Sequence, residues 1–193
     1  MVIRSKSARY VLYSQVCLLA ALAVCYALMP AVLHAEAGVS NYAVHPRTGF
    51  VYSLGFLLCA GFLLAAAGQL PANNRNLLVW RYALAGLAAL FIINLLSTFP
   101  YTINHSLNNL HKLADIVLMS AELLMGLFLA CVLAESWLIL GLFALQAVGM
   151  LVVLMTAEGR LHLLFLSQQL TGLVFAALLV AGTAKLTREP TQG

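Results

Sequence analysis

Six long apolar runs constrain the fold of this chain more than any other feature. A helix needs about 20 apolar residues to cross roughly 30 Å of hydrocarbon. The chain is 63% hydrophobic and only 8% charged, whereas soluble domains carry about 25% charged residues. We therefore predict an all-α, polytopic transmembrane bundle in which residues 1–193 form a single domain. The six predicted spans are residues 10–33, 48–70, 77–98, 112–134, 137–156 and 161–186.

The first apolar run has a second interpretation as a cleaved signal peptide. It is followed by Ala35-Glu36-Ala37, which has the small-x-small pattern of a signal-peptidase site. The apolar core of a signal peptide is roughly 7 to 15 residues long, and the run 10–33 is longer. Its length favours retention as the first span.

The basic residues predict the orientation in the membrane, because cytoplasmic loops are enriched in Lys and Arg. Seven of them fall on the side of the N-terminus, namely Arg4, Lys6, Arg9, Arg75, Arg81, Lys185 and Arg188. The opposite side has Arg47, Lys112 and Arg160. We expect a multi-pass protein of the cytoplasmic (inner or plasma) membrane with both termini inside. Although the net charge is +4, these residues form no patch for nucleic acid.

With this topology, all the histidines gather on the outer side. The predicted outer loops are residues 34–47, 99–111 and 157–161, and each histidine lies in or next to one of them: His34, His45, His105, His111 and His162.

The four cysteines all lie within apolar runs without CxxC spacing, which is typical of small buried side chains. They are Cys17, Cys25, Cys59 and Cys131.

A polar stripe runs down the fourth predicted span. At 100° per residue, His111, Asp115 and Glu122 fall within roughly 40° of one another on one helix face. An ionised carboxylate at the bilayer centre costs about 2.5 to 3.5 kcal/mol on insertion scales. We therefore expect this face to point into the bundle or into a water-filled cavity.

Neighbouring spans offer polar partners at matching depth. Asn94, Thr98 and Tyr101 share one face of the third span, and His162 and Gln169 share one face of the sixth, flanked by Gln168. Together with the stripe they predict an outward-facing polar cavity between the third, fourth and sixth spans. The alternative is that these groups only fix helix packing, at about 0.6 kcal/mol per contact.

A metal site is a further hypothesis for the outer face. Imidazole and carboxylate together suit zinc or another divalent ion, and the candidate ligands are His105, His111, Asp115 and His162. Only His111 and Asp115 have i, i+4 spacing on a helix, and the sequence contains no HExxH motif. Haem is disfavoured, because His111 and His162 both lie at helix ends. Neither a GxSxG elbow nor a glycine-rich phosphate loop is present.

The order of short motifs resembles a prokaryotic membrane family known as domain-of-unknown-function 998. After a basic start and a first span, the matching motifs are Val39-Ser40-Asn41, Leu54-Gly55-Phe56 with Gly61, Phe99-Pro100, Leu110-His111 and Gly159-Arg160. The resemblance covers nearly the whole chain. It implies a six-helix bundle and a role for the outer loop between Phe99-Pro100 and Leu110-His111, and it implies no reaction.

Our leading hypothesis is a non-enzymatic membrane protein whose outward-facing cavity binds a small ligand, a lipid headgroup or a proton. His111 is then the gate, Asp115 the charge partner and Glu122 the deep proton-carrying group. The first alternative is a metal-dependent intramembrane hydrolase or lipid-modifying enzyme at the outer leaflet. The second is a structural or interaction subunit of a membrane complex.

Overall fold

The structure is a computed structural model of the chain in which seven helices are described. It describes residues 5–30, 39–72, 74–98, 105–157 and 164–188, and for residues 105–107, 157, 164 and 165 the backbone alone. The helices are α1 (Lys6–Leu28), α2 (Asn41–Val44), α3 (Gly49–Gly68), α4 (Arg75–Thr98), α5 (His105–Val132), α6 (Trp137–Ala157) and α7 (Leu164–Leu186). No strand occurs in these ranges.

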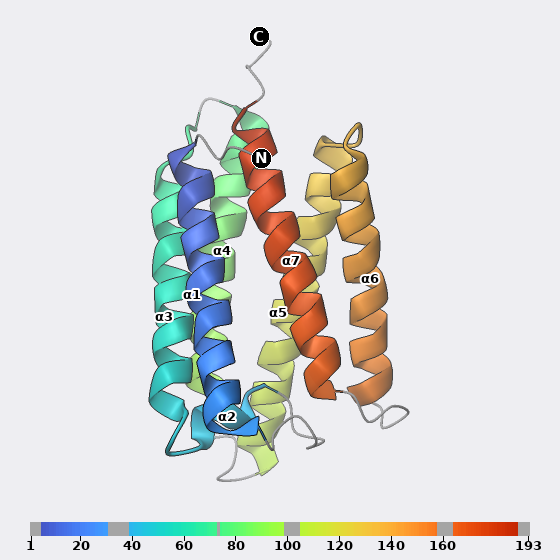
Figure 1. Cartoon of the computed structure of the whole chain (residues 1–193). Coiled ribbons are helices and arrows are strands. Elements are labelled where there is room, and N and C mark those ends of the chain that lie inside the picture. Colours follow the sequence, from blue (N-terminus) through green and yellow to red (C-terminus); the bar gives the residue numbers. More distant parts are fainter. Residues whose placement is uncertain (1–4, 31–38, 73, 99–104, 158–163, 189–193) are drawn as a thin grey trace.

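Six of the helices are long and apolar enough to cross a membrane, and only α2 is not. They run along one common axis, so that the start of α1 and the end of α7 lie at one end of the bundle and α2 at the other (Figure 1). The prediction of an all-α bundle with six spans is therefore confirmed. Such helices indicate that the chain is an integral membrane protein.

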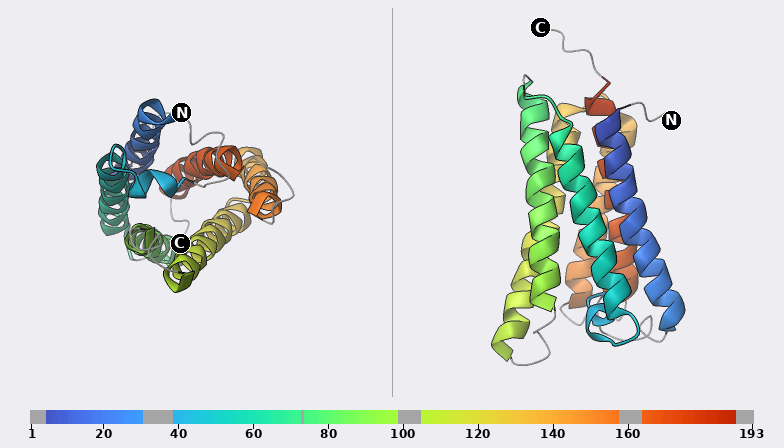
Figure 2. Two further views of the ribbon diagram at one scale, coloured as in Figure 1. Left: turned by 90° about the horizontal axis from the view of Figure 1, so that it is seen from below. Right: turned by 90° about the vertical axis from the view of Figure 1, so that its left-hand side faces the viewer.

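The six long helices form a ring in chain order. Viewed along the axis, α1, α3, α4, α5, α6 and α7 follow one another around the ring, and α2 lies across the end (Figure 2). Helix α1 packs most extensively against α3 and also contacts α7, which closes the ring. The first apolar run is thus an integral part of the bundle.

Apolar side chains cover the outside of the ring as well as its interior. Large hydrophobic residues such as Leu57, Leu138 and Leu145 are exposed, as expected for helices whose solvent is lipid. Inside, helices approach each other at small residues, the pattern of membrane bundles. A β-carbon at Gly55 of α3 would overlap the Ala21 β-carbon of α1, so glycine at this position allows the close contact between these two helices.

Local sequence signals account for several helix ends. The Ser5 side chain accepts a hydrogen bond from the Ala8 amide at 3.0 Å and so caps α1. Before α4, Asn74 Oδ1 accepts from the amides of Asn76 and Leu77 at 2.8 and 3.2 Å. These three hydrogen bonds satisfy amides that have no partner within their own helix.

Helix α5 begins at His105, about two turns before the fourth span expected from residue 112. The sequence predicted a loop at residues 99–111. In the structure, residues 105–111 belong to α5. His111 therefore lies on a regular helical turn at the α2 end of the bundle.

Candidate functional site

A central cavity of about 150 Å³ lies inside the ring toward the α2 end, and residues from all six long helices line it. Its polar lining residues are Gln15, Ser40, Tyr52, Asn94, Asp115, Glu122, Gln168, Gln169 and Thr171. The apolar ones are Leu18, Leu19, Leu22, Val39, Phe56, Phe91, Leu118, Met119, Met150, Val153 and Gly172. Asp115 and Glu122 are the only charged residues in the part of the lining that the structure describes.

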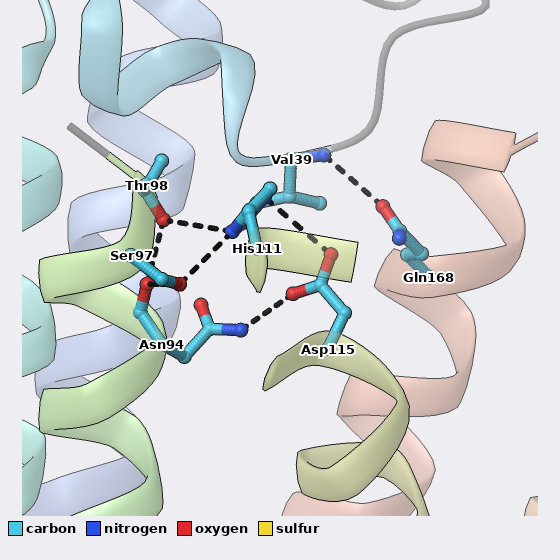
Figure 3. Close-up of polar contacts among 7 residues, drawn as sticks. All are labelled: Val39, Asn94, Ser97, Thr98, His111, Asp115 and Gln168. Atoms are coloured by element: carbon cyan, nitrogen blue, oxygen red, sulfur yellow. Dashed lines mark hydrogen bonds and ion pairs between the residues drawn. The ribbon is translucent and has the colours of Figure 1, made fainter. Parts of the chain in front are cut away.

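Asp115 is held by a network between α4 and α5 (Figure 3). Asn94 Nδ2 donates a hydrogen bond to Asp115 Oδ1, and His111 Nε2 lies 3.5 Å from Asp115 Oδ2. On the other side of the imidazole, His111 Nδ1 lies 3.2 Å from Ser97 Oγ and 3.5 Å from Thr98 Oγ1. Because 37% of the Asp115 side chain is exposed while His111 is buried, the carboxyl is the member of the pair that faces the cavity.

The hydroxyl groups of Ser97 and Thr98 determine where the imidazole carries a proton. Each donates its one proton to the Asn94 carbonyl oxygen, at 2.7 and 2.8 Å. In their contacts with His111 they therefore accept, and Nδ1 donates. Without a further proton, His111 Nε2 and Asp115 Oδ2 are both acceptors and cannot form a hydrogen bond with each other. One proton bound to either atom allows the contact. With that proton present, the pair is neutral overall, whichever residue holds it.

The order Ser97, His111, Asp115 superficially matches the nucleophile, base and acid of a serine hydrolase. In such enzymes the base accepts the proton of the nucleophile. Here Ser97 Oγ donates to its own helix instead, and Ser97 is not among the residues that line the cavity. Ser97 and Thr98 therefore orient the imidazole, and this geometry does not favour acyl transfer.

Glu122 forms the second, deeper level of the site. It follows Asp115 by seven residues, which is about 10 Å along the helix axis, and it lies near the middle of the apolar stretch of α5. No hydrogen bond or ion pair joins its carboxyl to any residue that the structure describes. Gln15 of α1 lines the same cavity, is buried, and donates from Nε2 to Ser14 Oγ at 3.0 Å.

Three aromatic rings line the cavity from α3 and α4. Tyr52 and Phe56 stack with ring centroids 4.5 Å apart, and Phe56 meets Phe91 edge to face at 5.6 Å. All three side chains are buried. The cavity therefore has an aromatic wall, defined as Tyr52, Phe56 and Phe91, as well as the carboxyl groups of α5.

At the mouth of the cavity, the segment that leads into α2 is tied to α7. The Val39 amide donates to Gln168 Oε1 at 3.0 Å (Figure 3), and Ser40 lines the cavity. Tyr42 of α2 is fully buried, and this burial raises the pKa of its phenol. Helix α2 is thus anchored as a cover on this end of the ring.

One hydroxyl group in the lining lacks a hydrogen-bond partner. Thr171 of α7 is 4% exposed, and its Oγ1 has no hydrogen-bond partner among the described residues. It lies against Gly149 of α6, where a β-carbon would crowd the hydroxyl. A buried hydroxyl without a partner costs about 1 to 3 kcal/mol, so a guest in the cavity that accepts or donates a hydrogen bond would offset that cost.

The structure brings most of the sequence-predicted site residues together. Asn94, Asp115, Glu122 and Gln169 line the cavity, and Thr98 and His111 support Asp115 from behind. Tyr101 and His162 lie outside the described residues, as does the side chain of His105.

The predicted metal ligands are largely beyond what the structure describes. No group of three or more His, Cys, Asp and Glu side chains gathers among the described residues. Of the four proposed ligands, only His111 and Asp115 have described side chains. The zinc hypothesis of the sequence analysis therefore stays a prediction.

Gln15, Ser97 and the aromatic wall were not predicted from the sequence. Gln15 was detectable, because a carboxamide in an apolar run is itself a signal of an inward face. Ser97 lies one residue before Thr98, and both hydroxyls reach the same imidazole nitrogen. The aromatic residues are ordinary in apolar helices, and only the ring arrangement shows that they share a cavity with the carboxyl groups.

Comparison with protein families, with curated proteins and with solved structures finds no match to this chain.

Proposed function

We propose that this integral membrane protein uses its central cavity to bind a small ligand, a lipid headgroup or a proton. The observation that carries the proposal is the placement of Asp115 and Glu122 in one cavity, at two depths, with no Lys or Arg among the lining residues that the structure describes. Ionisable groups within a membrane are energetically costly and as a rule serve a ligand or proton pathway. A purely structural contact would be obtained at lower cost from a neutral amide or hydroxyl.

Each member of the stripe has a distinct role in this proposal. His111 is the gate, because it lies at the α2 end and holds Asp115 through a neutral pair. Asp115 is the first carboxyl group that a ligand meets. Glu122 is the deep group, whose carboxyl has no protein partner among the described residues.

The orientation places the mouth of the cavity outside the cell in this proposal. The distribution of Lys and Arg puts the termini in the cytoplasm, and α2 lies at the opposite end of the bundle (Figure 1). A ligand or proton then reaches the carboxyl groups from the outer side. A six-helix bundle is also what the resemblance to the domain-of-unknown-function 998 family implies, and we propose that the chain belongs to this family.

Infrared spectroscopy tests whether the cavity exchanges protons with bulk water. Asp115 is the only aspartate in the chain, so ¹³C-aspartate labelling identifies its carboxyl stretch without ambiguity. We expect the Asp115 band and a second band, lost in Glu122→Gln, to change between the protonated and ionised forms as the pH of a nanodisc sample is varied. The matched control is Glu135→Gln at the exposed turn between α5 and α6.

Two results would argue against the proposal. If neither band responds to bulk pH, the cavity is sealed and the carboxyl groups serve packing. If the pH-dependent bands of Glu122→Gln are the same as those of Glu135→Gln, the deep carboxyl has no part in proton exchange.

A further inference from the structure

We infer that the ligand of the cavity is a small organic ammonium ion. Glu122 is its counter-ion, and the aromatic wall of Tyr52, Phe56 and Phe91 contacts its alkyl groups. This inference rests on the proposed function, since it names the class of ligand for the same cavity. It uses the charge, the aromatic content and the size of the site.

The charge of the lining calls for a cation. The Asp115 carboxyl already has a partner in His111, whose Nε2 lies 3.5 Å from Asp115 Oδ2. Glu122 has no such partner among the described residues, and the described part of the cavity lining includes neither Lys nor Arg. An ionised Glu122 in the middle of a membrane therefore requires a counter-charge from outside the protein.

The aromatic wall favours an organic cation over a bare metal ion. Ring faces attract ammonium groups by about 0.5 to 1 kcal/mol at exposed sites and by more in desolvated ones, and aromatic cages recognise alkylated ammonium ions. Metal ions need several oxygen, nitrogen or sulfur ligands at about 2 to 2.6 Å. The two carboxyl groups are about 10 Å apart along α5, too far to coordinate one ion together.

The size of the cavity limits the ligand to a few atoms. A cavity of about 150 Å³ is comparable to an engineered protein cavity of about that volume that holds benzene. An ammonium ion of about five to eight non-hydrogen atoms fits this space. Polar atoms of such a ligand have Gln168, Gln169 and the Thr171 hydroxyl within the same lining.

A proton competes with the ammonium ion for Glu122. The titratable groups in the lining are Asp115, Glu122 and Tyr52. Behind them lie His111, next to Asp115, and Cys59 of α3, whose sulfur is 4.0 Å from Gln15 Nε2. The described lining residues of α1, α4, α6 and α7 include no titratable group. Binding is expected to weaken as the pH falls, because the neutral carboxylic acid provides no counter-charge.

Calorimetric titration of the full chain in phosphatidylglycerol nanodiscs provides the test. The probes are tetramethylammonium and choline, and 3,3-dimethyl-1-butanol is the control because it has the shape of choline without the charge. We expect both cations to bind at least about tenfold more tightly than the alcohol, a ratio that corresponds to about 1.4 kcal/mol. Equal binding of choline and the alcohol would overturn the inference.

Substitutions locate the binding site. Glu122→Gln is expected to weaken binding of both cations at least about tenfold, while Glu135→Gln leaves it unchanged. Phe56→Leu keeps an apolar side chain but removes one ring face, and it is expected to weaken tetramethylammonium binding by about three- to thirtyfold. If neither cavity variant changes the affinity relative to Glu135→Gln, the cation binds elsewhere and the inference is wrong.

A second lipid composition identifies the source of the ammonium group. If phosphatidylethanolamine in the nanodisc competes with tetramethylammonium, a lipid headgroup is the natural occupant, and if it does not, the occupant is a free amine. Both results support an ammonium ligand. If the infrared bands of Asp115 and Glu122 respond to pH but neither cation binds, this inference fails and the proposed function remains.

Discussion

Replacing Glu122 by leucine tests whether this carboxyl group holds the bundle together or serves a ligand. On insertion scales, an ionised residue at the centre of a membrane helix costs about 2.5 to 3.5 kcal/mol, whereas leucine contributes about −0.3 to −0.6 kcal/mol. The difference of roughly 3 to 4 kcal/mol is an upper limit, because Glu122 faces a cavity with polar neighbours rather than lipid. We expect Glu122→Leu to stabilise the ligand-free protein by about 1 to 3 kcal/mol.

Reversible unfolding in mixed detergent and dodecyl sulfate micelles, followed by circular dichroism, measures this change. Glu135→Leu at the exposed turn is the control, with an expected change within about 0.5 kcal/mol. If Glu122 were a packing contact between helices, its removal would instead cost about 0.6 to 1.7 kcal/mol. A decrease of that size in the free energy of unfolding of Glu122→Leu would refute the reasoning that this carboxyl makes no stabilising contact with a neighbouring helix.

Three further predictions concern the scaffold and the mouth of the cavity. Gly55→Ala is expected to destabilise the bundle by about 1 to 3 kcal/mol, because the added methyl group separates α1 from α3. A β-carbon at Gly61 meets nothing within 4 Å, so Gly61→Ala is expected to be neutral or to stabilise by up to about 1 kcal/mol. Equal effects of the two variants in chemical unfolding would contradict the close contact. Thr183→Val removes the acceptor of the Trp80 Nε1 hydrogen bond at 3.0 Å, and it is expected to lower the free energy of unfolding by about 0.6 to 1.7 kcal/mol. In a Trp137→Phe background, it is also expected to change the fluorescence of Trp80. An unchanged spectrum would show that the hydrogen bond is not formed. Gln168→Leu removes the acceptor of the Val39 amide, so hydrogen exchange at Val39 is expected to accelerate relative to Gln169→Leu, and equal exchange rates would show that Gln168 does not hold this segment.

The fold could be predicted from the sequence because membrane solvation permits few solutions. Every backbone group must be satisfied within the bilayer, so six apolar runs predict six helices. The ends of the helices were less predictable. Asn and His between 105 and 111 are typical of loops, yet α5 begins at His105, so polar composition alone did not locate the start of this helix.

The core of the site could be predicted because its residues follow one periodicity. His111 and Asp115 are one turn apart, and Glu122 is two turns deeper, so the helix alone places them on one face. The contact of Asn94 with Asp115 joins two helices, and it could be predicted because the two residues lie at similar depths in neighbouring spans. Depth alone did not suffice for Gln15 or for the aromatic wall, because their neighbours depend on how α1, α3 and α4 rotate within the ring.

Water-edited solid-state NMR on bilayer samples labelled with ¹³C in Asp, Glu and Gln tests the central claim most directly, because it reports which side chains contact water inside the bundle. Gln146 is fully buried and does not line the cavity, so it provides the internal reference for a dry position. We predict that the carboxyl carbons of Asp115 and of Glu122, the latter assigned by its loss in Glu122→Gln, receive magnetisation from water well before the Gln146 carboxamide. If the Glu122 carboxyl stays as dry as Gln146, the claim of a solvated cavity that reaches the middle of the membrane is wrong.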